Sequence, residues 1–110
     1  MKLPNGERAN LGTKLEDYSL NPLHRHGQHK ARVFQSVLGI TLENSSVLRD
    51  ALRQAAANSD QAVHRGHNGF GTVYELRFSL STAHGTATVL SGWIIRDDED
   101  FPRLATCFII

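Results

Sequence analysis

The strongest constraint on the fold is an alternating hydrophobic pattern in the second half of the chain. In "VYELRFSL" (73–80), apolar side chains from Tyr74 onward stand at every second position, which is the period of a half-buried β-strand. Two further strands are expected at 86–96 and 103–109, after the tight turn "TAHG" and the polar loop "DDEDFP". Because short turns join antiparallel neighbours, these three strands should pair in sequence order.

Helical patterns occupy the first half of the chain. "TKLEDYSL" (13–20) predicts a short helix that stops at the following Asn-Pro pair. "GQHKARVFQSVLG" predicts a helix over 28–38, and "NSSVLRDALRQAAANSD" predicts one over 45–57, with its apolar residues spaced for one buried face. Three helices therefore precede the strands.

Residues suited to helix caps flank these segments. Thr13 and Glu16 have the spacing of a capping box at the start of the first helix. Gly39 suits the end of the second helix, where a left-handed residue is favoured. Asn44 or Ser45 is expected to cap the third helix.

This order of elements predicts an α+β fold, in which N-terminal helices pack on a three- to four-stranded antiparallel β-meander. "DQAV" (60–63) would add a short fourth strand at an edge, and "HRGHNGFGT" is expected to form a glycine-rich turn region. The length of 110 residues, 40% of them hydrophobic, suits a single domain over residues 1–110.

Composition excludes several classes of function. The formal net charge is +1, so affinity for nucleic acid must come from a local patch. The one cysteine cannot form an internal disulfide, and the N-terminus lacks the apolar core of a signal peptide. No segment is long and apolar enough to span a membrane, and we expect a cytoplasmic protein. The chain has no phosphate-binding glycine loop, Rossmann fingerprint or nucleophile elbow.

The stretch "NPLHRHGQHKARVF" (21–34) contains three of the six histidines, two arginines and a lysine. Lys30 falls near the middle of the apolar arc of the predicted helix. It either extends along the edge of that arc to reach water, or points its ammonium at an anion held between helix and sheet. In the second case the helix N-terminus would also bind the anion, and His24, His29 and Arg32 would complete a positive pocket.

The histidines do not form a convincing metal site. His24, His26 and His29 have no nearby carboxylate or cysteine, and zinc ligands normally come as two closely spaced pairs. The other three histidines are expected in exposed loops. Arg49, Arg53, Arg77 and the "DDED" run are expected on solvated faces.

The last predicted strand contains two polar residues among apolar ones. Arg103 stands at its start, and Thr106 is assigned to the same alternation as Leu104 and Phe108. Threonine suits a β-sheet, and an arginine after a proline is often a surface residue, so both have a structural interpretation. Both also suit a phosphate site.

Several blocks of this sequence resemble a bacterial family known as domain of unknown function 6883. Its motif falls on the residues His24, Gly27, His29, Lys30, Ala31, Phe34, Trp93, Pro102, Arg103 and Thr106. The chain departs from it at Arg25, where many members have proline, and His26 falls on a variable position. The blocks are "MKLPNGERA", "KLEDYSLNPLH", "GQHKARVFQSVLGI", "SGWIIR" and "DFPRLATCFII".

The resemblance implies a toxin. Members of the family occur beside small partner proteins and at the C-terminal ends of larger toxin-like proteins, which implies a cognate antitoxin or immunity protein as partner. The order of helices and strands is similar to that of the barnase–EndoU–colicin–RelE group of metal-independent ribonucleases.

RNA cleavage without metal requires proton transfer at the 2′-hydroxyl and 5′-oxygen, and stabilisation of charge on the phosphate. Protein side chains can supply all of these groups, provided that the last strand lies beside the second helix. The predicted site therefore needs no cofactor. The alternatives are a non-catalytic binding or immunity-like module, and an enzyme acting on a nucleotide. The predicted catalytic residues are His24, His29, Lys30, Arg103 and Thr106, and the predicted RNA-binding residues are Arg32, Trp93 and Arg96.

Overall fold

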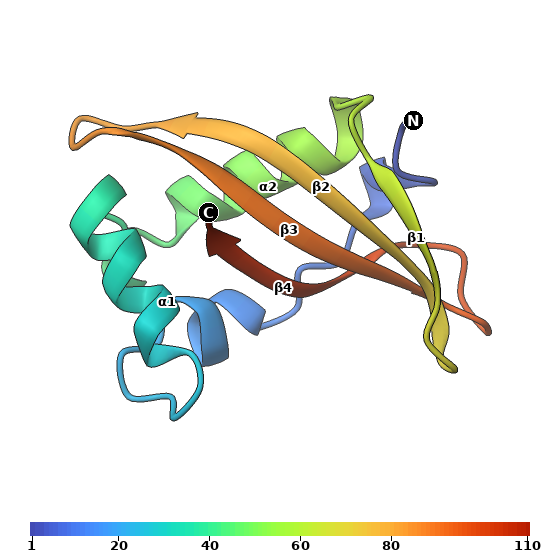
Figure 1. Ribbon diagram of the computed structural model, residues 1–110, viewed down its shortest axis with the longest axis horizontal. Coiled ribbons are helices and arrows are strands. Elements are labelled where there is room, and N and C mark those ends of the chain that lie inside the picture. The colour runs from blue at the N-terminus through green and yellow to red at the C-terminus, as the bar shows by residue number, and fades with distance from the viewer.

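The computed structural model describes all residues from 1 to 110, and its helical elements precede four strands (Figure 1). The helical elements are η1 (Gly6–Arg8), η2 (Leu15–Ser19), α1 (Gln28–Val33), η3 (Phe34–Leu38), η4 (Leu42–Asn44) and α2 (Ser46–Asn58). The strands are β1 (Val63–His67), β2 (Gly71–Ser81), β3 (Thr86–Arg96) and β4 (Arg103–Ile109). Each strand pairs antiparallel with the next, in the order β1-β2-β3-β4. The predicted α+β class and antiparallel meander are confirmed.

The prediction for the segment after residue 60 was wrong in part. "HRGH" lies in β1 rather than in a turn, so His64 and His67 are strand residues, and the predicted strand at 60–63 overlaps β1 only at Val63. The pairing with β2 shifts between His64 and Gly66, where Gly66 has φ +102°. Strand β1 lies at the edge of the sheet and is mostly exposed, so its sequence lacks the apolar alternation by which strands are predicted.

A second correction concerns the phase of β4. Thr106 pairs with Gly92 but Leu104 pairs with Trp93, so Ala105 is the extra residue of a β-bulge. The bulge reverses the alternation, and Thr106 lies on the opposite face from the buried Leu104. Sequence periodicity alone gives no sign of such an extra residue.

The helix predicted at 28–38 is present as the continuous elements α1 and η3. It ends at Gly39, which has φ +67°, as predicted. The N–H groups of Gly39 and Ile40 donate to the carbonyls of Gln35 and Phe34, which is the hydrogen-bond pattern of a glycine-terminated helix.

The predicted N-caps are wrong. The side chain of Thr13 makes no capping hydrogen bond, although its carbonyl accepts from the Asp17 N–H at 2.8 Å. Ser45 precedes α2 without capping it. Asn44 instead accepts from the Thr41 N–H at 2.7 Å and so closes a capping box around η4.

Helices and strands contribute to one hydrophobic cluster. At its centre Trp93 is fully buried, and its Nε1 donates to the Ser91 hydroxyl at 2.9 Å. Ser91 in turn donates to the Leu76 carbonyl at 2.8 Å. The buried polar groups of Trp93 and Ser91 are thus satisfied within the core. The main contributors from the helices and the turn after η2 are Leu15, Leu20, Phe34, Leu38, Leu48 and Leu52.

The N-terminal segment connects both edges of the sheet. The Ala62 N–H donates to the Met1 carbonyl at 2.9 Å, just before β1. At the other edge, the Asn10 N–H donates to Pro102 at 2.8 Å and the Leu104 N–H donates to Asn10 at 2.9 Å. Asn10 therefore extends the sheet beyond β4 through one parallel bridge with Arg103.

Gly27 brings α1 into direct contact with η2. A Cβ atom at this position would lie 2.0 Å from the Tyr18 carbonyl oxygen, so no larger residue fits without displacing backbone. This close approach holds Tyr18 beside the first turn of α1.

Candidate functional site

A cleft of about 430 Å³ lies at the outer edge of β4, beside the segment that Asn10 joins to this strand. Its walls come from the segment 10–18, from His24 and from the adjacent ends of β3 and β4. The sequence predicted that the last strand would contribute to a site with the second helix, and three of the predicted residues line this cleft: His24, Arg96 and Arg103. The polar lining residues are Asn10, Thr13, Lys14, Asp17, Tyr18, His24, Arg96 and Arg103.

Lys30 reaches this cleft through Tyr18. Its Nζ donates to the Tyr18 hydroxyl at 2.7 Å and lies 4.6 Å from the centre of the Tyr18 ring and 5.6 Å from that of Phe108. The ammonium is half-buried between these rings, where cation–π attraction stabilises it. Because an ammonium only donates, the Tyr18 hydroxyl keeps its own hydrogen free for another acceptor.

His24 is oriented by the backbone of its own turn. Its Nδ1 accepts from the N–H groups of His26 at 3.0 Å and Gly27 at 2.9 Å. The neutral ring therefore carries its hydrogen on Nε2, the nitrogen that remains available to a ligand. The ring centre also lies 4.8 Å from that of Tyr18, edge to face.

These contacts also use part of the N-terminus of α1, where the sequence predicted that an anion binds. The Gly27 N–H donates to the His24 ring, and the N–H groups of Gln28 and Ala31 donate to the carbonyls of His24 and Gly27. The amides of Gly27, Gln28 and Ala31 are thus occupied, whereas those of His29 and Lys30 donate to no acceptor in the chain, so anion binding at this helix end stays a prediction.

Arg103 lies in the cleft but is paired with an acid. Its Nε and Nη2 donate to the two Glu99 oxygens at 2.8 and 2.7 Å. This hydrogen-bonded pair raises the pKa of Arg103 and lowers that of Glu99. By contrast, Lys14 and Arg96 form no ion pair and present their full charge.

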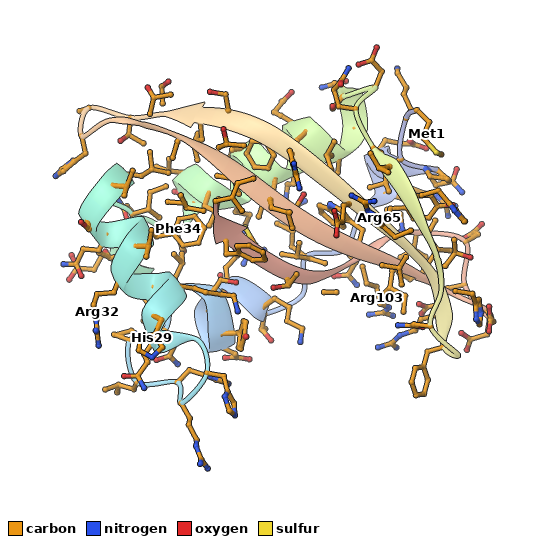
Figure 2. All side chains as sticks on the ribbon, in the orientation of Figure 1. Met1, His29, Arg32, Phe34, Arg65 and Arg103 are labelled. Carbon is orange, nitrogen blue, oxygen red and sulfur yellow. The ribbon has the colours of Figure 1, made fainter.

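The other predicted site residues lie outside the cleft. Figure 2 shows His29 and Arg32 on α1, at the other end of the molecule from Arg103. Thr106 does not line the cleft, and its Cγ2 lies over Gly92 instead. Trp93 is fully buried and has no surface for RNA.

Sequence analysis missed Lys14, Asp17 and Tyr18. They lie far along the chain from β3 and β4, and only the path of the N-terminal segment beside β4 brings them into the cleft. Asp17 is the one carboxylate of the lining. Nothing in "TKLEDYSL" distinguishes these residues from an ordinary exposed helix face.

The "DDED" run does more than cover a solvated face. Asp97 binds His67 at 2.8 Å, Glu99 binds Arg103, and Asp100 binds Arg8 at 2.9 Å. The pKa of Asp100 is lowered because Arg8 donates to it. Arg49, also expected to be solvated, pairs with Glu16.

No three His, Cys, Asp or Glu side chains are grouped so that they could hold a metal ion. None of the helices has both the length and the apolar character needed to cross a bilayer.

The family model for domain of unknown function 6883 matches residues 2–110. The chain belongs to this family. No curated protein matches. Among solved structures, the chain is similar to one from a contact-dependent growth inhibition toxin–immunity protein complex of Klebsiella pneumoniae 342. The TM-score is 0.72 at 15% identity, over 96% of both chains, so the two share a fold.

Proposed function

We propose that this member of the family is a toxin that cleaves RNA without a metal ion, and that the cleft beside β4 is its active site. The observation that carries this proposal is the Lys30–Tyr18 pair at a cleft lined by Lys14, Arg96 and Arg103. The similar structure comes from a toxin–immunity complex, which supports a role in such a system. A cognate immunity protein or antitoxin would then be its protein partner.

The reaction is an attack of the ribose 2′-oxygen on the adjacent phosphorus. A bond forms between these two atoms while the bond from phosphorus to the 5′-oxygen breaks. The 2′-hydroxyl gives up a proton, the 5′-oxygen takes one, and negative charge accumulates on the phosphoryl oxygens. The site therefore needs a base, an acid and positive charge.

Tyr18 is the proposed acid. Its free hydrogen passes to the 5′-oxygen, and the Lys30 ammonium stabilises the phenolate that remains. Lys30 is thus a positioning residue that acts through Tyr18. Asp17 accepts the 2′ proton, since it is the one carboxylate at the cleft.

The remaining lining residues stabilise the phosphate. Lys14 and Arg96, which form no ion pair, supply positive charge, and His24 donates from Nε2 to a phosphoryl oxygen. Preorganised donors of this kind typically each contribute about 10²–10³ in rate.

The test compares RNA cleavage by Tyr18→Phe and Lys30→Met with cleavage by the matched control His29→Ala. Tyr18→Phe keeps the ring and removes the proton, so cleavage should fall by about 10²–10⁴. The rate of RNA cleavage by Lys30→Met should fall by about 10²–10³, whereas His29→Ala should cleave RNA at the wild-type rate. Circular dichroism checks folding, and wild-type activity should persist in a strong chelator.

A second substrate distinguishes the acid from a merely structural role. Uridine 3′-(4-nitrophenyl phosphate) has a leaving group that needs no proton. On it, Tyr18→Phe and Lys30→Met should approach the wild-type rate, whereas Arg96→Ala should stay slow. RNA cleavage at the wild-type rate by Lys30→Met would contradict the proposed active site. A folded wild type that binds RNA or a protein partner but neither cleaves RNA nor arrests growth would favour the non-catalytic module.

A further inference from the structure

Phe70 is an exposed aromatic residue on a well-held backbone. It lies in the connection between β1 and β2, and 75% of its surface is exposed. Asn68 Oδ1 accepts from the N–H groups of Phe70 at 2.9 Å and Gly71 at 3.1 Å. A large apolar side chain is thus presented to solvent by a turn whose amides are satisfied.

The hairpin tip is also tied to the loop that follows β3. The Asp97 N–H donates to the Phe70 carbonyl at 3.1 Å, and His67 Nε2 lies 2.8 Å from Asp97 Oδ1. Figure 1 shows this hairpin and the β3–β4 loop at the same end of the sheet. These links fix Phe70 relative to β3.

A second cavity, of about 560 Å³, lies under Phe70 and borders the cleft. Its lining consists of Phe70, Ile94, Arg96, Asp97 and Asp98. Ile94 and Arg96 also line the cleft, so the two spaces share a wall. The Phe70 cavity therefore lies directly beside the cleft.

The two spaces differ in charge. The cleft has the unpaired cations Lys14 and Arg96 and suits a phosphate. The Phe70 cavity shares Arg96 with the cleft, but adds the carboxylates of Asp97 and Asp98 to an aromatic and an aliphatic side chain. Carboxylates repel phosphate but accept hydrogen bonds from the amino groups of bases.

We infer that the Phe70 cavity binds a nucleobase of single-stranded RNA, next to the phosphate held in the cleft. This inference rests on the proposed function. The base stacks on Phe70, as bases stack on aromatic side chains in other proteins that bind single strands. Asp98, which has no ion-pair or hydrogen-bond partner, accepts from the edge of the base. Bases that carry an amino group, such as guanine and cytosine, are favoured over uracil.

The experiment measures binding of a fluorescent 2′-O-methyl oligonucleotide, which cannot be cleaved, by anisotropy. Phe70→Ala should weaken binding by about tenfold or more, and Phe70→Trp should retain it. Leu23→Ala is the matched control, since Leu23 is 92% exposed on another loop. An abasic oligonucleotide should bind wild type and Phe70→Ala equally, because it has phosphates but no bases.

The outcomes separate this inference from the proposed function. If Phe70→Ala binds the oligonucleotide like wild type while Arg96→Ala weakens binding, the base site is wrong and the phosphate site stands. If Phe70→Ala impairs binding of a protein partner but not of the oligonucleotide, the inference is also overturned. Loss of preference for guanine or cytosine over uracil in Asp98→Asn would support it.

Discussion

Two charged regions of this molecule use their charges in opposite ways. In the loop between β3 and β4, three of the four acidic residues bind a basic side chain, with Arg103, Arg8 and His67 as partners. In the basic stretch 21–34, no side chain forms an ion pair. Its one half-buried ammonium, on Lys30, donates to the uncharged Tyr18 hydroxyl instead.

The comparison shows two different uses of charged side chains in one fold. The acidic loop uses its charges to connect β1, β4 and the N-terminal segment. The basic stretch keeps its charges without internal partners, so they are available to an external anion. The composition, with a net charge of +1, cannot reveal this difference, because it depends on which charges meet in the fold.

The largest expected effect comes from removing an unpaired charge from the cleft. Arg96→Ala should lower RNA cleavage by about 10²–10³, the usual cost of losing one preorganised donor. Arg8→Ala removes an arginine that is paired with Asp100 outside the cleft and should leave cleavage unchanged. The rates of RNA cleavage by the two purified variants test this prediction. Equal losses of rate would contradict the distinction between paired and unpaired charge.

The next effect concerns the packing that positions the basic stretch. Gly27→Ala should lower the free energy of unfolding by about 1–3 kcal/mol, as overpacking does, because its Cβ would overlap the Tyr18 carbonyl oxygen. Urea denaturation measures this loss. Ser36→Ala, an exposed position later in the same helix, should change stability by less than about 0.5 kcal/mol. An unchanged free energy of unfolding in Gly27→Ala would show that α1 and η2 are less closely packed than the structure indicates.

A smaller effect should appear in the acidic loop as pH falls. Arg103 holds the pKa of Glu99 below its ordinary value of 4.5. The pair therefore stabilises the fold above pH 4.5, and this contribution is lost as pH falls through the lowered pKa. Glu99→Gln should be less stable than wild type at neutral pH and lose less stability on acidification. Urea midpoints at several pH values measure both, with the unpaired Asp98→Asn as control.

The smallest effect is expected at Cys107. Burial raises the pKa of its thiol to about 12, so almost no thiolate exists near pH 8. A thiol reagent such as 5,5′-dithiobis(2-nitrobenzoate) should not react with the native protein, and should react with one thiol per chain in urea. Rapid reaction of the native protein would indicate that β4 opens readily.

The sequence predicted those elements whose local pattern decides the structure. β2 was predictable because Tyr74, Leu76 and Phe78 alternate regularly, and the second helix because Gly39 ends it. β1 was placed too early, at 60–63, because an exposed edge strand needs no apolar face and so gives no alternating pattern. The predicted alternation of side chains in β4 was wrong, because the bulge at Ala105 is set by pairing with β3.

The candidate site was only partly predictable. Arg96, Arg103 and His24 were among the predicted residues, because such side chains suit a phosphate site, and all three line the cleft. Tyr18 was not, because its importance comes from the contact with Lys30, twelve positions away. Trp93 was wrongly predicted to bind RNA, because a tryptophan in a strand can lie either in the core or on the surface.

The link between Asn10 and the last strand predicts an order of folding. Its hydrogen bonds to Pro102 and Leu104 join opposite ends of the chain, and closing so long a loop costs conformational entropy. We expect the N-terminal segment to settle on β4 after the meander has formed. Since Asn10, Leu11 and Gly12 also line the cleft, we expect the cleft to assemble late. Partial unfolding should open it while amide protons of β2 and β3 remain protected from exchange.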